Sequence, residues 1–272
     1  MPAPRGWDWW WDATWNPVGG CSYVSSGCRN CFVPSWIVSH THRKDVHHGV
    51  TERVNGRAVF NGKLTALPDG HPLWRWPLDW PGAEHPKLGP RKPSLIWIAD
   101  MSDLFIEDRP KEIIGRALAT VVISEHIGLV LTKRSARMAE FFAAQSPHTK
   151  RLWQPKLLLG FSAEGQQEFD ERWPDMRALT HEGWFVFVSI APMLGPVKLP
   201  DDFRALGKRT WCIVSGEQKI PHTRCRDMDP DLARVVRDQC RKAGIPFFMK
   251  QMAKGAPIPP DLQLLRQFPA VS

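Results

Sequence analysis

The chain has 272 residues, of which 43% are hydrophobic and 24% are charged, a composition typical of a globular protein with a full core. Its first residues contain no apolar stretch of signal-peptide length, and no uninterrupted apolar run is long enough to cross a membrane. We therefore expect a cytoplasmic protein with no membrane partner. In that compartment the six cysteines are reduced, which argues against a disulfide framework.

The net charge of +8 indicates an anionic partner. Two segments carry much of the excess: residues 133–156 hold six Lys and Arg against one acid, and residues 198–254 hold thirteen against seven. A basic face is typical of proteins that bind a nucleotide or nucleic acid, but a solvated cationic surface has the same composition. The charge alone leaves both interpretations open.

Three cysteines lie within eleven residues near the start of the chain, at Cys21, Cys28 and Cys31. Gly19-Gly20 precedes them and Gly27 lies among them, so the backbone can turn back and direct three sulfurs to one point. Three thiolates leave one coordination position of a metal group open. The spacing predicts either an iron–sulfur cluster or a zinc ion. Zinc would take a fourth ligand from His40, His42 or Cys225.

Short apolar runs alternate with helical patterns along the rest of the chain. Residues 13–16 are expected to form a short first strand, and Pro34 to open a helix after the cysteines. The later apolar runs suit strands that are buried on both faces of a parallel sheet. Helical patterns between them include residues 110–124 and 229–244. The later strands are expected at residues 95–99, 127–131, 157–160, 184–188, 211–214 and 245–249.

This order of elements predicts an α/β fold, a complete or partial (β/α) barrel that forms one domain over residues 1–272. Residues 44–93, after the cysteine loop, contain many turn signals, and Asn55-Gly56 is a strong hairpin signal. We expect a loop-rich insertion with a small β-hairpin there. Periodicity alone does not distinguish the barrel from a doubly wound open sheet.

Polar residues follow nearly every apolar run. In parallel α/β folds the C-terminal ends of the strands meet at the ligand site, and a loop after the first strand lies on the same rim. This arrangement favours the barrel. The polar residues at the predicted strand ends are Asp100, Ser102, Asp103, Lys133, Arg134, Ser162, Ser215, Glu217, Lys250 and Gln251.

Eight short segments carry a resemblance to known proteins: residues 15–18, 20–21, 27–32, 101–105, 131–134, 189–196, 214–217 and 247–251. In this order they resemble a phage-associated three-Cys-motif family, the phage gene product thirty-seven / sixty-eight type, over most of the chain. The chain departs from that family at Ala191, where the family tends to have glutamate. The cysteine loop is also similar to that of the radical S-adenosylmethionine (SAM) superfamily, although its spacing is Cys-x6-Cys-x2-Cys rather than Cys-x3-Cys-x2-Cys.

The resemblance to the radical SAM superfamily implies a barrel of that type, in which Cys21, Cys28 and Cys31 hold a [4Fe-4S] cluster with one iron open to SAM. The implied reaction is reductive cleavage of SAM to methionine and a 5′-deoxyadenosyl radical, with electrons from a flavodoxin or ferredoxin. The resemblance assigns no catalytic residue. Residues expected to contact SAM or the substrate are Asp100, Ser102, Asp103, Lys133, Ser162, Ser215 and Glu217, with Arg134 as an alternative to Lys133.

The charge and the resemblance together suggest modification of a nucleotide or nucleic acid. The alternative is a non-catalytic nucleic-acid-binding protein in which zinc or a cluster stabilises the cysteine loop. The rim residues also have structural alternatives, because Asp100, Asp103 and Ser162 could cap helices and Lys133 could be a surface charge.

Overall fold

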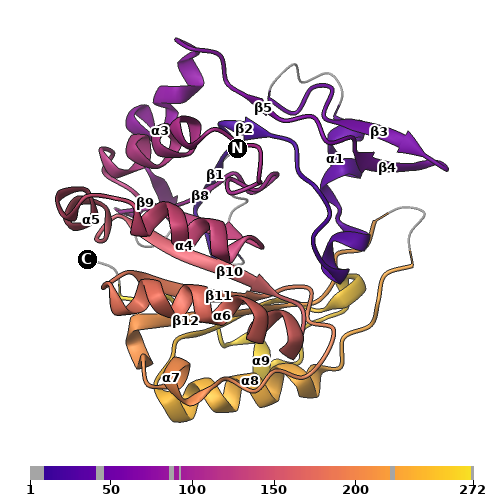
Figure 1. The fold of residues 1–272 in the computed structure, drawn as a ribbon. Helices are drawn as coiled ribbons and strands as arrows, with labels where there is room; N and C mark the ends of the chain where they lie inside the picture. Colours follow the sequence, from indigo (N-terminus) through magenta and orange to yellow (C-terminus); the bar gives the residue numbers. More distant parts are fainter. Residues whose placement is uncertain (1–8, 41–45, 86–88, 92, 221–223, 271–272) are drawn as a thin grey trace.

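The computed structural model describes residues 9–40, 46–85, 89–91, 93–220 and 224–270 (Figure 1). In this part of the chain, seven parallel strands form the main sheet, and their order in the sheet is their order along the chain. Each run of apolar residues predicted to be a strand forms one. The strands are β1 (Ala13–Trp15), β8 (Leu95–Ile98), β9 (Ile127–Thr132), β10 (Leu157–Ala163), β11 (Phe185–Ile190), β12 (Thr210–Ser215) and β13 (Phe247–Gln251).

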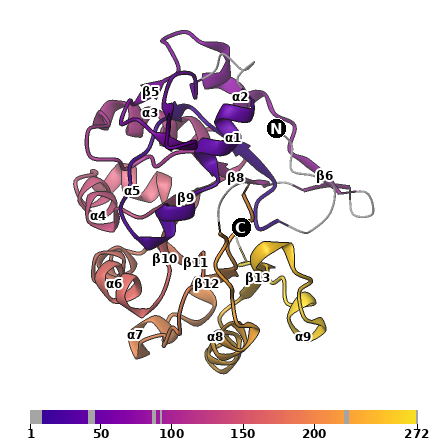
Figure 2. The ribbon, with the colours of Figure 1, turned by 90° about the vertical axis from the view of Figure 1, so that its right-hand side faces the viewer.

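The sheet is curled into a half-barrel, with helices along its outer face (Figure 2). A doubly wound sheet would reverse its strand order at a switch point, whereas this order runs straight from β1 to β13. The prediction of a partial barrel is therefore confirmed, and the open doubly wound alternative is wrong. No pairing between β1 and β13 occurs among the described residues, so the barrel is partial rather than complete.

Helices follow most strands and cover the outer face of the sheet (Figures 1 and 2). The helices predicted at residues 110–124 and 229–244, and the helix opened by Pro34, are all present. The α-helices are α1 (Val33–Ser39), α2 (Trp76–Asp79), α3 (Lys111–Val122), α4 (Ser135–Ala143), α5 (Pro147–Trp153), α6 (Gln166–His181), α7 (Asp201–Arg204), α8 (Pro230–Ala243) and α9 (Pro260–Gln263). Short 3-10 turns occupy Ser26–Asn30, Pro72–Arg75, Gly207–Arg209 and Ala253–Gly255.

The segment between β1 and β8 contains the predicted hairpin. Strands β3 (Thr51–Val54) and β4 (Arg57–Phe60) pair antiparallel, and the turn residues Asn55 and Gly56 both have positive φ, at 49° and 77°. That conformation is the one an Asn-Gly hairpin turn requires. Two further small antiparallel pairs flank the hairpin in this segment: β2 (Val18–Gly19) with β5 (Thr65–Ala66), and β6 (Ala83–His85) with β7 (Gly89–Arg91).

The inner, concave face of the sheet has its own apolar core, separate from the core beneath the helices. Trp10, Phe187, Trp211 and Phe248 dominate it, with ring centroids of neighbouring pairs about 6 Å apart. Gly160 makes room for this layer, since a Cβ there would lie 2.2 Å from the Phe187 ring. The half-barrel is therefore filled with side chains below its rim. Within the described residues, no helix is long and apolar enough to cross a membrane.

Candidate active site at the strand ends

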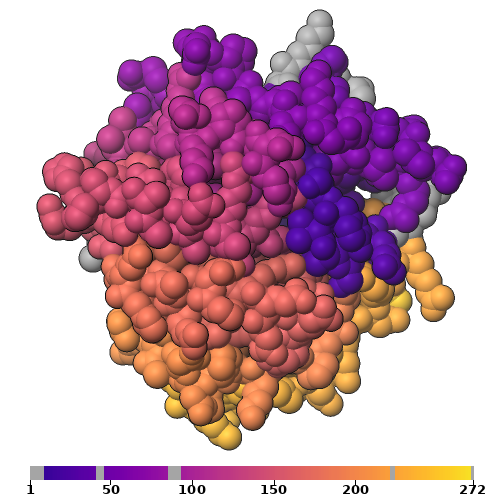
Figure 3. Space-filling model, viewed as in Figure 1, coloured from indigo at the N-terminus to yellow at the C-terminus, as the bar shows by residue number. Residues whose placement is uncertain are grey.

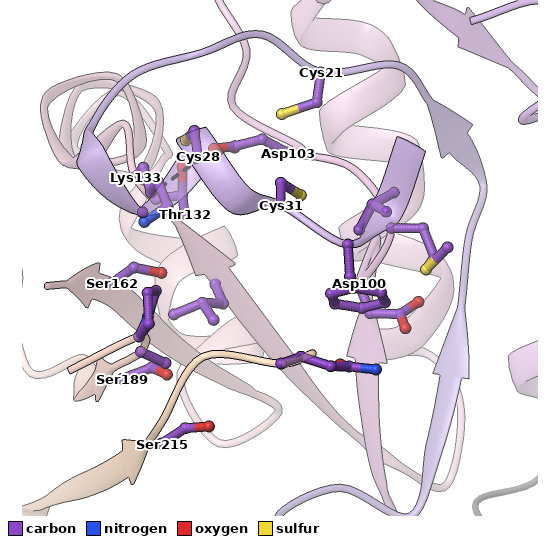
Figure 4. Close-up of a pocket in the computed structure, with 18 of the residues that line it drawn as sticks. Cys21, Cys28, Cys31, Asp100, Asp103, Thr132, Lys133, Ser162, Ser189 and Ser215 are labelled. Carbon is purple, nitrogen blue, oxygen red and sulfur yellow. Dashed lines mark hydrogen bonds between the residues drawn. The ribbon is translucent and has the colours of Figure 1, made fainter. Parts of the chain in front are cut away.

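A cavity of about 230 Å³ lies at the C-terminal ends of the strands, beneath the cysteine loop (Figure 4). The ten residues predicted to bind metal or cofactor come from five separate parts of the sequence, and all ten line this one cavity. They are Cys21, Cys28, Cys31, Asp100, Ser102, Asp103, Lys133, Ser162, Ser215 and Glu217. The structure thus brings the predicted residues together, while their individual roles stay predictions.

Strand periodicity explains why polar side chains line the cavity above an apolar layer. Side chains two residues apart on a strand share a face, so Ser162, Ser189 and Ser215 continue the inner faces of β10, β11 and β12 beyond the apolar layer. Ser162 and Ser189 are direct neighbours in the strand register. The same alternation places Lys133 above Leu131 and Lys250 above Phe248. None of these serines caps a helix, because α6 begins later, at Gln166.

The cysteine loop runs from β2 through a 3-10 turn at residues 26–30 into α1 and covers one side of the cavity (Figures 1 and 4). In the space-filling view this early part of the chain lies at the surface, between the purple insertion and the orange and yellow C-terminal part (Figure 3). Gly20 starts the loop with a φ of +85°, and a Cβ there would lie 2.1 Å from the Lys63 carbonyl oxygen. Only glycine fits both that conformation and that approach.

The thiols of the loop interact electrostatically with one another. The pKa of Cys21 is raised to about 12, chiefly by burial and to a smaller extent by negative charge on Asp103, Cys31 and Cys28, while Arg134 opposes the rise. Burial raises the pKa of Cys31 to about 11, with the Val33 amide and Lys133 opposing. Without an added cation the thiols of Cys21 and Cys31 are therefore protonated at neutral pH.

The thiols are not clustered tightly around a point. Among the described residues, no three His, Cys, Asp or Glu side chains are close enough together to hold a single metal ion. Of the fourth ligands considered for zinc, Cys225 donates to the Glu217 carbonyl oxygen, and His40 stacks on Trp36. His42 lies outside the described residues.

Glu164, which the sequence did not single out, joins the cysteine loop to the sheet. Its side chain is 1% exposed and accepts hydrogen bonds from Ser25 of the loop at 2.7 Å and from Lys133, and it pairs with Arg172 at 3.3 Å. Burial acts to raise the pKa of Glu164, but Lys133, Ser25 and Arg172 outweigh it, so the pKa lies below its ordinary value. Glu164 is consequently an anion that holds the loop in place.

Glu217 and Asp103 make further links between the rim and the loop. Glu217 is 4% exposed and accepts hydrogen bonds from Asn30 at 3.0 Å and from the Arg226 backbone at 2.6 Å and guanidinium. Asp103 pairs with Arg134 at 3.0 Å, and Arg134 in turn donates to Ser22 at 2.6 Å. Since both carboxylates have protein partners, each positions the cysteine loop in this structure.

The other end of the cavity carries Asp100. Asn16 donates to Asp100 Oδ1 at 2.5 Å, and burial raises the pKa of Asp100 to about 6 despite that bond and the charge of Lys250. Burial lowers the pKa of Lys250 to about 8, with Asp100 opposing. Figure 4 shows Asp100 and Lys133 on opposite sides of the cavity, with Cys31 between them.

A family model described as "Protein of unknown function (DUF5131)" matches residues 9–258. The chain belongs to this family. The DUF5131 match spans all seven strands and every residue placed in the cavity. No curated protein and no solved structure matches the chain.

In this DUF5131 member, sequence reasoning missed four residues that the geometry places in or beside the cavity: Asn16, Glu164, Ser189 and Lys250. Asn16 and Glu164 directly follow a strand, and Ser189 and Lys250 are each the last residue but one of a strand. Lys250 and Asn16 stood among the polar residues and motifs near predicted strand ends, but nothing in the sequence ranked them above their neighbours. The sequence shows that these residues lie near strand ends. It does not show which side chains they contact in the folded protein.

Proposed function

We propose that this protein is an iron–sulfur enzyme of the radical SAM type. The observation that carries the proposal is the meeting of three cysteine side chains and the polar strand ends of a (β/α) half-barrel in one cavity. In such folds the strand ends are the site of chemistry. A three-thiolate loop at that position is suited to a metal group with a free coordination position that faces the cavity.

A zinc ion and a cluster make different demands on the spacing of the thiols. Zinc–sulfur bonds of about 2.3 Å bring tetrahedral ligands within roughly 4 Å of one another, whereas cysteines on a [4Fe-4S] cluster each bind a separate iron and lie further apart. Cys21, Cys28 and Cys31 line one cavity, and the described residues contain no group of three candidate ligands placed to hold a single ion. The choice of a cluster rests instead on the coordination position that three thiolates leave open beside the cavity.

The charges around the thiols also suit a cationic metal group. Two of the three have pKa values raised to about 12 and 11, chiefly by burial, so their thiolates need positive charge beside them. Arg134 and Lys133 supply part of it, but each is already paired with a carboxylate. Iron would supply the rest.

When bound, a cluster of this type with SAM supplies one-electron reductive cleavage of a carbon–sulfur bond, and so hydrogen abstraction from unactivated carbon. Cys21, Cys28 and Cys31 would hold the cluster. Glu164, Asp103 and Glu217 fix the loop that carries these thiols, through Ser25, Arg134 and Asn30. The aromatic layer below the rim excludes water from beneath the site, and the hydroxyls of Ser162, Ser189 and Ser215 supply neutral hydrogen bonds to a ligand.

The test is anaerobic reconstitution with iron and sulfide, followed by reductant and SAM. We expect about four iron and four sulfide per chain, and 5′-deoxyadenosine as a product. The Cys28→Ala variant should lose both, while Cys240→Ala, a buried cysteine outside the cavity, should keep both. A colourless protein with one zinc per chain and no SAM cleavage would refute the proposal.

The substrate class that the net charge of +8 favours is an anion, either a nucleotide or a nucleic acid. A flavodoxin or ferredoxin is the proposed electron donor. Phosphate contacts release counterions, so nucleic-acid affinity in a gel shift should fall steeply as salt is added. Affinity that is absent at low salt, or that salt leaves unchanged, would contradict the nucleic-acid part alone.

A further inference from the structure

Three cationic side chains line the cavity, and two of them are already neutralised. Lys133 forms an ion pair with the buried Glu164. Arg134 pairs with Asp103 at 3.0 Å and with Glu107 at 2.8 Å. These two cations therefore stabilise the site itself and have little charge left for a ligand. The sequence had assigned Lys133 or Arg134 to a ligand carboxylate or phosphate.

The third cation, Lys250, has no such partner among the residues that the structure describes. Its ammonium group makes no hydrogen bond or ion pair with any residue that the structure describes. It lies 5.2 Å from the ring centre of Trp9 and 5.3 Å from that of Trp11, an arrangement of the cation–π kind. The aromatic faces stabilise the charge without using the three N–H donors.

The neighbouring carboxylate of Asp100 does not accept a hydrogen bond from the Lys250 ammonium group in place of a ligand. Asp100 is close enough to influence Lys250 electrostatically, but no ion pair joins the two. One oxygen of Asp100 is occupied by Asn16 at 2.5 Å. A partly buried ammonium group whose donors have no acceptor is costly, and an anionic oxygen in the cavity would remove that cost.

We propose that Lys250, beside the Asn16–Asp100 pair, binds an anionic oxygen group of the substrate, a phosphate or a carboxylate. The aromatic surroundings of Lys250, with Trp10 and Trp97 also lining the cavity, leave a planar apolar surface beside the anion. The substrate would thus be held at one end of the cavity, with its reacting part toward the cysteine loop. That the bound anion belongs to a substrate depends on the proposed function, whereas the existence of the anion site does not.

A substrate site fits this position better than a SAM site. The cations that act on the thiols are Arg134 for Cys21 and Lys133 for Cys31. Lys250 instead interacts with Asp100, which lies across the cavity from Lys133 (Figure 4). A group held beside the thiols would meet Arg134 and Lys133. A second molecule at the Asp100 end of the cavity would meet Lys250.

The experiment is competitive acetylation of the metal-free protein with acetic anhydride, with each lysine quantified by mass spectrometry. We expect Lys250 to react, and inorganic phosphate or acetate at about ten times its Kd to reduce that reaction about tenfold. Lys254, exposed and paired with Asp227, serves as the internal control and should not change. If SAM alone protected Lys250 from acetylation, Lys250 would belong to the cofactor site. If Lys250 were not acetylated, or if no anion protected it, Lys250 would have a structural role. Each of these results would overturn the proposal.

Matched variants give a second readout. The protecting anion should raise the Tm of the wild type and of Lys254→Met, leave that of Lys250→Met unchanged, and raise that of Lys250→Arg partly. An equal rise in Tm for Lys250→Met and wild type would overturn the proposal. Anion protection without 5′-deoxyadenosine formation would contradict only the enzymatic function, so the two failures are distinguishable.

Discussion

Gly27 of the cysteine loop lies directly against the carboxylate of Glu164 at the end of β10. A Cβ on residue 27 would lie 2.2 Å from Glu164 Oε1, and the nearby Ser25 hydroxyl donates to the same oxygen. Ser25 and Glu164, which are 139 positions apart in the sequence, are thus joined by a hydrogen bond beside the close approach of Gly27. The loop that carries the thiols can sit over the cavity only because residue 27 has no side chain.

Gly27→Ala should therefore displace the cysteine loop. Because the clash is with a buried, ion-paired carboxylate, we expect the free energy of unfolding to fall by about 1–3 kcal/mol and iron uptake on reconstitution to fall with it. Gly115→Ala is the control, since a Cβ there meets nothing within 4 Å and alanine favours the helix α3. That variant should be neutral or more stable by up to about 1 kcal/mol. Equal behaviour of the two variants in urea denaturation would contradict the close approach.

Glu164→Gln should weaken both the fold and the loop. The change removes the negative charge that pairs with Lys133 and Arg172 and leaves the buried Arg172 guanidinium without a carboxylate. Breaking one side of a buried pair costs about 3 kcal/mol. Glu140→Gln, which breaks the exposed pair with Lys111, should cost less than about 1 kcal/mol.

The same variant tests the protonation state of Glu164. The pKa of Glu164 lies below its ordinary value, because Lys133, Ser25 and Arg172 outweigh the effect of burial. Its contribution to stability is thus present above the unfolded pKa of about 4.3 and lost as pH falls toward the folded pKa. The difference in unfolding free energy between wild type and Glu164→Gln should shrink below about pH 4. A difference that stays constant down to pH 3 would show that the charge is not what Glu164 contributes.

The strands could be predicted because burial on both faces leaves a direct mark on the sequence. An almost uninterrupted apolar run such as that of β10 or β11 is required by a sheet covered on both sides, and the first polar residue marks its end. The sequence of helix α6 has no comparably clear pattern. It contains Pro174 and many charged residues, so its pattern is not that of an amphipathic helix.

The cavity residues could be predicted as a group but not as individual roles. Their shared position at strand ends placed Lys133 and Lys250 on one rim, yet the sequence does not show which lysine meets a carboxylate. That depends on Glu164, 31 positions from Lys133, and on the absence of such a partner near Lys250 among the described residues. The pairs Asn30–Glu217 and Ser25–Glu164 are still more remote along the chain, at 187 and 139 positions. Local sequence patterns contain no record of contacts at such separations.

The thiols of the metal-free protein should react slowly with iodoacetamide. With pKa values of about 12 and 11, Cys21 and Cys31 hold roughly a thousandfold and a hundredfold less thiolate at pH 8 than cysteines of ordinary pKa, and the thiolate is the nucleophile. Alkylation of each, followed by mass spectrometry, should rise about tenfold per pH unit up to about pH 11. The protein unfolded in guanidinium is the control. Rates at pH 8 that match those of the unfolded chain would show that the thiols are ionised without a metal.

Lys250→Met should stabilise the ligand-free protein at neutral pH. Burial lowers the pKa of Lys250 to about 8 although Asp100 opposes this shift, so the folded protein binds its proton less tightly than the unfolded chain, where lysine has a pKa of about 10.4. The penalty is complete below about pH 8 and disappears as pH rises to about 10.4. Methionine keeps the volume without the charge, so we expect a gain on the order of 1–2 kcal/mol at pH 7, reduced because the side chain is partly exposed.

Urea denaturation of wild type, Lys250→Met and Lys254→Met at pH 7 and pH 10 measures this effect. The gain of Lys250→Met should be present at pH 7 and nearly absent at pH 10, while Lys254→Met, which changes only an exposed pair with Asp227, should differ little from wild type at either pH. A loss of stability in Lys250→Met at pH 7 would mean that the ammonium group is already satisfied inside the protein. A gain that fades with rising pH is expected of a site residue whose N–H donors find an anionic acceptor only when its ligand is bound.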